Sequence, residues 1–195
     1  MPAHSAAKFE HQHLRLLDGL AASIREKGLA QTHVSDIVGH ARASRRTFYK
    51  HFADKDSCLI ELVHLSATRI IEAVSATIDL DAARAAQTEQ AIDAYLSILS
   101  SEPVLVLALS SPSVGERVIR AQREGLERFA EFLVALIAAT TQSGASPASI
   151  SLECAYMLTS GLRAAALRAM ECAESLDNLR REAKALFNAA LDRNA

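Results

Sequence analysis

The segment from Thr32 to Lys55, THVSDIVGHARASRRTFYKHFADK, decides the fold that we predict for the whole chain. Its first half places Val34, Ile37 and Val38 on one side of a short helix. Its second half repeats aromatic residues at helical spacing, and Ala41–Ser44 lies between the halves. The segment therefore predicts two short helices joined by a tight turn.

The second of these helices, Arg45 to Phe52, is predicted to have one apolar and one polar face. Ser44 can cap its first turn, and Phe48 and Phe52 stand one turn apart toward the core. The opposite side carries hydrogen-bond donors: Arg45, Arg46, Thr47, Tyr49, Lys50 and His51. This pattern predicts a helix-turn-helix, whose second helix fits the major groove of B-DNA. The alternative is a small helical bundle with a solvated basic face.

Position along the second helix predicts a different DNA contact for each donor. Arg45 and Arg46 lie at the end that faces base edges, where an arginine can bond both O6 and N7 of guanine. Thr47 can touch a thymine methyl group or a phosphate. Donors further round are predicted to bind phosphate oxygens, which fixes the register without reading sequence: Tyr49, His51 and Lys55.

The residues before the turn complete a predicted three-helix unit. His13–Lys27 carries a one-sided apolar stripe that Gly28 ends, and residues 1–12 are polar and expected to fray. Thr32 is predicted to cap the next helix, with Asp36 near its positive end. The hydroxyl of Thr32 and the amides at this helix start would offer a further phosphate contact.

The remainder of the 195-residue chain is predicted to be helical as well. Alanine and leucine dominate, and four prolines and seven glycines leave long uninterrupted segments. Apolar stripes at helical spacing bring the total to about nine helices. We therefore predict an all-α protein with an N-terminal domain at residues 1–54 and a larger helical domain at residues 55–195.

Charge is distributed unevenly between these two parts. Residues 1–55 hold nine Lys/Arg against five Asp/Glu, a net of +4, and six of the seven histidines. Because the whole chain has a net charge of −2, the rest carries −6. A basic segment on an acidic body suits a chain that touches phosphate at one end, although chance clustering would look the same.

Several classes of function find no support in the sequence. Cys58, Cys154 and Cys172 lack the spacing of a disulfide framework or a zinc site, and we expect no metal or cofactor. Nucleophile elbows, phosphate loops and zinc-protease motifs are missing, so we do not expect an enzyme. Met1–His13 has no apolar signal region, and the most apolar run, Pro103–Leu109, is too short for a membrane span. We expect no membrane partner and a cytoplasmic location.

Residues 14–62 resemble the N-terminal domain of TetR/AcrR-type transcriptional regulators, whose pattern is roughly T…IA..AGVS.GTLY.HF.SKE. The matching residues are Thr32, Ile37-Val38, Ala41-x-x-Ser44, the run Thr47-Phe48-Tyr49-Lys50-His51-Phe52, and Lys55-Asp56. Three residues depart from this pattern. Arg42 and Ala43 replace the usual Gly and Val of the turn, and Arg46 stands where a small residue is common. The resemblance implies that Arg45, Arg46 and Thr47 face bases, whereas the backbone is held by Thr32, Ser44, Tyr49, His51 and Lys55.

The resemblance also implies a homodimer, formed through the last two helices at about residues 147–170 and 175–191. The first of these is rich in small residues between Ala155 and Ala166, which let helices approach closely. An intrachain helix contact would explain the same small residues.

A small-molecule effector inside the larger domain is the third implication of the resemblance. The candidate lining is apolar, which suits a hydrophobic or amphipathic ligand, although such stripes also form ordinary cores. We predict it from Tyr95, Leu99, Leu105, Leu109, Phe129, Phe132, Leu133, Met157 and Arg163. Arg163 could meet an acidic ligand, or instead Glu153, Glu171 or solvent.

These expectations combine into one function with one alternative. The sequence predicts a ligand-responsive repressor that binds a palindromic double-stranded DNA operator as a homodimer and is released by a small hydrophobic molecule. The alternative is a helical adaptor that binds another protein without DNA. Steep loss of affinity with added salt would distinguish DNA binding, because phosphate contacts release counterions.

Overall fold

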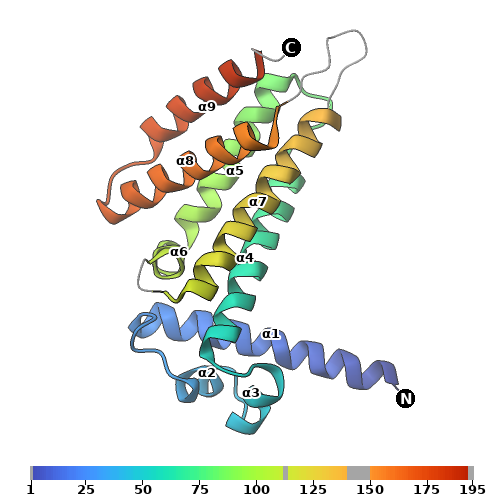
Figure 1. Cartoon of the computed structure of the whole chain (residues 1–195), viewed down its shortest axis with the longest axis vertical. Helices are drawn as coiled ribbons and strands as arrows, with labels where there is room; N and C mark the ends of the chain where they lie inside the picture. Colours follow the sequence, from blue (N-terminus) through green and yellow to red (C-terminus); the bar gives the residue numbers. More distant parts are fainter. Residues whose placement is uncertain (1, 112–113, 140–149, 193–195) are drawn as a thin grey trace. The chain divides into compact units, whose positions relative to one another are not determined.

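The computed structural model describes residues 2–111, 114–139 and 150–192. These residues form nine helices and no strand, which confirms the predicted all-α fold (Figure 1). The helices are α1 (Pro2–Lys27), α2 (Val34–His40), α3 (Arg45–His51), α4 (Lys55–Thr77), α5 (Arg84–Ser101), α6 (Pro103–Ser110), α7 (Glu116–Ala139), α8 (Leu152–Glu171) and α9 (Asp177–Asp192). The predicted loop at Ser143–Pro147 lies outside the described residues.

The chain packs into two compact units, which we call the head and the body. The head consists of Met1–Leu65 and Val104–Gln122, and the body of Ser66–Pro103 and Arg123–Ala195. The head is therefore built from two segments that are separate in the sequence. The division into functional domains at residues 1–54 and 55–195 stays a prediction.

The core of the head is built where α1 crosses α2 and α3. Leu16, Leu20, Ile37 and Phe48 are fully buried there. The backbones approach so closely that a Cβ atom on Gly19 would lie 2.6 Å from the carbonyl oxygen of Ile37. Glycine therefore sets the distance at which α2 rests on α1.

The expectation that residues 1–12 fray is wrong, because α1 begins at Pro2. Aromatic contacts explain the difference. The ring of Phe9 stacks on that of His51, with 4.0 Å between centroids, and His13 packs on Phe52 at 4.7 Å. These contacts tie the polar start of α1 to the end of α3, and a periodicity search for apolar stripes does not detect them.

The body is organised around α5, which packs against α9, while α8 also packs against α9 (Figure 1). Asp93 on α5 accepts hydrogen bonds from Arg180 and Lys184 on α9, each at 2.8 Å. These paired charges hold α9 along α5. No single described helix is long and apolar enough to cross a membrane, although α5 and α6 pass that test of length and composition together as a bent pair.

Candidate functional site

The turn between α2 and α3 is braced from α1. Arg42 has φ 47°, the left-handed conformation that normally favours glycine. The guanidinium of Arg15 donates to the carbonyl oxygen of Ala41 and, at 3.4 Å, to that of Arg42. A residue that the sequence did not single out, Arg15, therefore holds the strained turn in place.

Ser44 caps α3 as predicted. Its Oγ accepts a hydrogen bond from the backbone N–H of Thr47 at 3.0 Å and lies 2.9 Å from the Thr47 hydroxyl. Phe48 and Phe52 are 0% and 3% exposed, which confirms their predicted place in the core. The short helix is thus fixed at its start by a cap and along its inner side by two rings.

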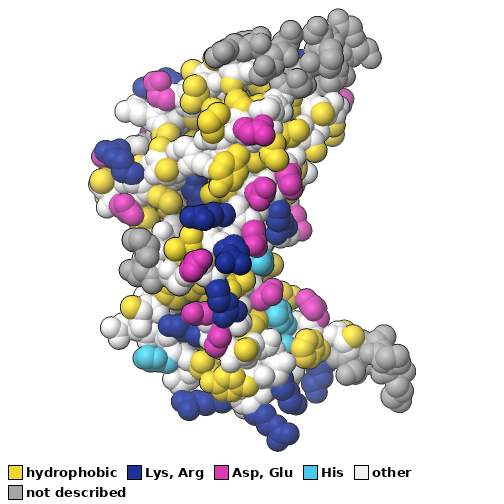
Figure 2. Space-filling view, viewed as in Figure 1, with side chains coloured by type: hydrophobic (Ala, Val, Ile, Leu, Met, Phe, Trp, Pro, Cys, Tyr) yellow, Lys and Arg dark blue, Asp and Glu magenta, His cyan; other side chains and the backbone are white. Residues whose placement is uncertain are grey.

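The outer face of α3 is open and basic. Arg45, Arg46 and Lys50 are exposed, and none of the three forms an ion pair with another described residue. Tyr49 is 57% exposed and meets Phe48 edge-on. In the space-filling view, Lys and Arg side chains gather at the end of the head formed by α2 and α3 (Figure 2). The structure therefore presents these four side chains together, whereas Thr47 is half-buried.

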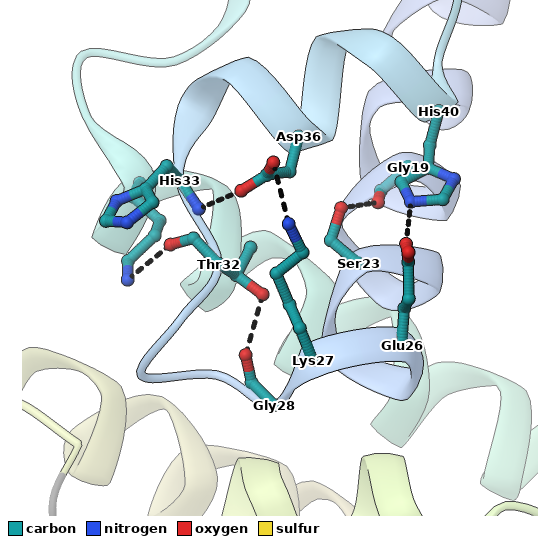
Figure 3. A network of polar contacts seen from close by, with 10 residues as sticks. Gly19, Ser23, Glu26, Lys27, Gly28, Thr32, His33, Asp36 and His40 are labelled. Carbon is teal, nitrogen blue, oxygen red and sulfur yellow. Dashed lines mark hydrogen bonds and ion pairs between the residues drawn. The ribbon is translucent and has the colours of Figure 1, made fainter.

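The prediction that Thr32 caps α2 is wrong. The N-cap is His33, and the hydroxyl of Thr32 donates to the carbonyl oxygen of Gly28 at 2.8 Å (Figure 3). Thr32 is 0% exposed, so its hydroxyl closes the end of α1 and does not face solvent.

Lys55 is also used inside the head. Its ammonium group donates to the carbonyl oxygens of Leu29 and Thr32, at 3.3 and 3.0 Å. Lys55 therefore fastens the loop between α1 and α2 to the start of α4. An ammonium group has three donors, so one remains for a phosphate.

A polar network fixes α2 on α1 (Figure 3). The Asp36 carboxylate accepts from the His33 backbone N–H at 2.8 Å and from Lys27 at 2.9 Å. These two contacts, the backbone one first, hold the pKa of Asp36 below its ordinary value. At the other end of α2, His40 lies 2.9 Å from Glu26. Helix α2 is thus anchored to α1 at both of its ends.

His51 lies at the end of α3, where its ring packs against α1. It is half-buried against Phe9 and His13, and its Nδ1 is buried without a hydrogen-bond partner among the described residues. Burial, followed by the charges of His13 and Lys50, lowers the pKa of His51, whereas Glu10 raises it. Its side chain braces α1, and its predicted phosphate contact stays a prediction.

The body contains an apolar cavity of about 50 Å³ enclosed by residues of α5, α7, α8 and α9, together with Ile150 before α8. Three of the predicted ligand residues line it: Tyr95, Phe129 and Leu133. The other lining residues were not predicted as ligand contacts: Arg84, Gln87, Thr88, Ala91, Ile92, Leu136, Ile137, Ile150, Ala155, Thr159, Leu162, Phe187 and Leu191. With Tyr95 included, the lining residues on α5 recur at i, i+3, i+4, i+7, i+8 and i+11 from Arg84, a spacing that the sequence itself contains.

Six predicted ligand residues do not line this cavity. Leu105 and Leu109 belong to the hydrophobic core of the head, and Met157 is 66% exposed. Leu99 is buried outside the lining, and Phe132 only packs on Phe129, at 5.9 Å between ring centroids. Arg163 is half-buried outside the lining, but its charge acts on Tyr95. Hydrophobicity alone could not separate core from lining.

No group of three or more His, Cys, Asp and Glu side chains in the described ranges could hold a metal ion. Cys58 is buried in the core of the head, and burial raises its pKa to about 12. Its thiol is therefore protonated at neutral pH and a poor nucleophile.

The helix-turn-helix of the head matches a known family. Residues 16–62 match the family model described as bacterial regulatory proteins, tetR family. These residues form a tetR-family domain. The resemblance drawn from the sequence is thereby confirmed over this segment. No curated protein matches the chain.

Solved structures extend the likeness beyond the tetR-family segment. A TetR-family regulator structure from Mesorhizobium loti MAFF303099 is 20% identical, with a TM-score of 0.70 over 94% of this chain and 96% of that one. The fatty acid degradation regulator FadR from Bacillus halodurans is 17% identical, with a TM-score of 0.73 over 90% and 93%. FadR from Bacillus subtilis, in complex with stearoyl-CoA, is 20% identical, with a TM-score of 0.64 over 92% and 95%. The chain therefore has the fold of these regulators.

Proposed function

We propose that this chain is a ligand-responsive repressor that binds a palindromic DNA operator as a homodimer. The observation that carries the proposal is the start of α3, where exposed Arg45 and Arg46 follow the Ser44 cap without an ion pair to a described residue. A guanidinium held at this end of a recognition helix can donate two hydrogen bonds to a guanine edge. Tyr49 and Lys50 lie on the same exposed face and would bind phosphates.

Binding to duplexes selected from a random DNA library tests this proposal. We expect affinity to fall steeply between 50 and 200 mM salt, by roughly 10³-fold or more if six or more phosphates are contacted. Arg45→Ala should weaken one base position by about 1–3 kcal/mol and relax specificity there. Arg69→Ala, on the exposed side of α4, removes the same charge elsewhere and is the matched control. A chain that selects no duplex, or binds without salt dependence, would favour the protein adaptor instead.

The homodimer is proposed through α8 and α9. Met157, Gly161 and Ala164 form an exposed stripe on α8, and a Cβ atom on Gly161 would meet nothing within 4 Å. Leu186 on α9 is 59% exposed. By contrast, Ala155 and Ala166 are buried within the chain, so only part of the small-residue pattern is available to a second copy. Sedimentation at micromolar concentration gives the mass, and a monomer would refute this interface.

Release by a small hydrophobic molecule is proposed from the cavity of the body. Its lining is almost wholly apolar, and it is lined by four different helices. A ligand that enters it must therefore alter how these helices pack. The stearoyl-CoA complex of FadR, which has the same fold, supports an aliphatic ligand. Loss of operator binding on addition of such a molecule would support this part of the proposal.

A further inference from the structure

Besides the cavity of the body, the head contains a hollow of about 190 Å³ between α1 and the turn that joins α2 to α3. This volume is many times the roughly 10–15 Å³ that one water molecule requires. We call it the turn hollow, and it is lined by Gln12, Arg15, Ala41, Arg42, Ala43, Ser44 and Thr47. Two of these described residues are arginines and none is acidic. The charge of the turn hollow therefore favours an anion.

Arg42 lines the turn hollow at a strained backbone position. Its φ of 47° lies in the left-handed region, where glycine is unstrained and a residue with a Cβ atom is strained. The side chain is exposed and forms no hydrogen bond or ion pair with another described residue. The polar contacts of the folded chain therefore give no reason for an arginine at this position. A ligand of its guanidinium outside the chain would give one.

Arg15 has donors left for the same ligand. Its Nη2 donates to the carbonyl oxygens of Ala41 and Arg42, but its Nη1 and Nε bond no other described residue. Of the five N–H groups of a guanidinium, the three on Nη1 and Nε therefore remain unused. Arg15 also neutralises two carbonyl oxygens whose partial negative charge would otherwise repel an anion from the turn hollow.

Uncharged donors complete the lining. The hydroxyl oxygens of Ser44 and Thr47 lie 2.9 Å apart, and Ser44 Oγ also accepts the Thr47 backbone N–H at 3.0 Å. Only one of the two hydroxyl hydrogens is used between them, so the other can be donated outward. The Gln12 amide forms no hydrogen bond with another described residue and supplies two further N–H donors. Side chains from α1, the turn and α3 thus bring unused donors to one space.

We propose that the turn hollow binds one phosphate group of the DNA backbone, held by Arg42, Arg15 and Gln12. The inference rests on the proposed DNA binding and adds a contact that fixes the position of α3. Ser44, which lines the same hollow, is followed directly by Arg45, so the DNA backbone that borders the major groove passes close to this turn. Because a phosphate has the same charge in every sequence, the contact positions the protein without reading bases.

Fluorescence anisotropy of the full chain on a duplex selected from the random library, and on an unrelated duplex, tests the proposal. Arg42→Gly removes the guanidinium and relaxes the turn. We expect it to weaken binding to both duplexes about tenfold per protomer, because hydrogen bonds to charged groups are the stronger ones. The slope of log affinity against log salt should fall by about 1 per protomer. Thermal unfolding is the fold control, since a variant at least as stable as the unaltered chain does not lose DNA by unfolding.

Two matched variants and a chemical probe sharpen the test. Gln12→Ala removes a neutral donor, so we expect a loss of about threefold in affinity for both duplexes and no change in salt slope. Arg69→Ala removes an exposed arginine of α4 and should change neither affinity nor slope. Ethylation of single phosphates locates the contact on the duplex. One ethylated phosphate per half-site should weaken binding of the unaltered chain and leave binding of Arg42→Gly unaffected.

Each contrary result has a separate meaning. A loss confined to the selected duplex means that Arg42 reads bases, and it overturns the phosphate contact. Unchanged affinity and slope in Arg42→Gly overturn the proposal, and the DNA-binding function stands if Arg45→Ala still relaxes specificity. Binding of inorganic phosphate without DNA, abolished in Arg42→Gly, assigns the turn hollow to a free anion instead. A chain that binds no duplex overturns both the contact and the proposed function.

Discussion

The strained turn gives a prediction whose size can be worked out from the backbone. Arg42 has φ 47°, where a side chain costs roughly 1–2 kcal/mol. Replacement by glycine removes that strain, but glycine also loses about 0.5–1 kcal/mol more conformational entropy on folding. The side chain of Arg42 is exposed, and Arg15 bonds backbone carbonyl oxygens, which the substitution keeps. We therefore expect Arg42→Gly to stabilise the chain by about 0.5–1 kcal/mol.

Thermal unfolding followed by circular dichroism measures the effect. For a chain of 195 residues, about 0.5–1 kcal/mol corresponds to a rise in Tm of roughly 1–4 °C. Arg42→Ala is the matched control, because it removes the same side chain but still requires the left-handed backbone. A Tm for Arg42→Gly at or below that of the unaltered chain would refute the strain argument. An equal gain in Arg42→Ala would assign the effect to the side chain.

Two further variants separate anchoring residues from DNA contacts. Lys55→Met removes the hydrogen bonds to Leu29 and Thr32 and should lower the free energy of unfolding, measured with a chemical denaturant, by about 1–3 kcal/mol. Lys50 is exposed, so Lys50→Met should weaken DNA binding and leave the free energy of unfolding unchanged. An equal loss of stability in both variants would contradict this. The pKa of His51 is lower in the folded chain than in the unfolded chain, so as the pH falls the unfolded chain takes up a proton on His51 before the folded chain does. Neutral His51 therefore contributes fully to stability above about pH 6.5, and this contribution is lost as the pH falls through the folded pKa. His51→Phe should therefore lose less Tm between pH 7.5 and 5.5 than the unaltered chain, and the same loss in both would exclude His51 as the cause.

Local chemistry made several features of the head predictable. The Ser44 cap, the break at Gly28 and the core positions of Phe48 and Phe52 depend on neighbours within about one helical turn. Thr32 shows the limit of that reasoning. A threonine before a helix resembles an N-cap, but the observed cap is His33, and the Thr32 hydroxyl bonds the end of the preceding helix.

Long-range contacts explain the residues that were missed or misplaced. Arg15 braces a turn 26 and 27 residues away, and Lys55 bonds carbonyl oxygens 26 and 23 residues before it. Leu105 was predicted in the ligand cavity because it is apolar, but it belongs to the segment Val104–Gln122, which completes the core of the head. The spacing of neighbouring residues in the sequence does not reveal such partners, because they lie far away along the chain.

The sequence by itself determined the class of the chain, because helical periodicity, caps and the basic face of Arg45–His51 are local properties of the polymer. It also predicted the tetR-family segment that residues 16–62 match. Only the tertiary structure decided which donors stay free for DNA and which serve the fold, and which apolar residues enclose a cavity. Those outcomes depend on burial and on partners distant in sequence, since an arginine or a leucine has the same chemistry until packing determines what it touches.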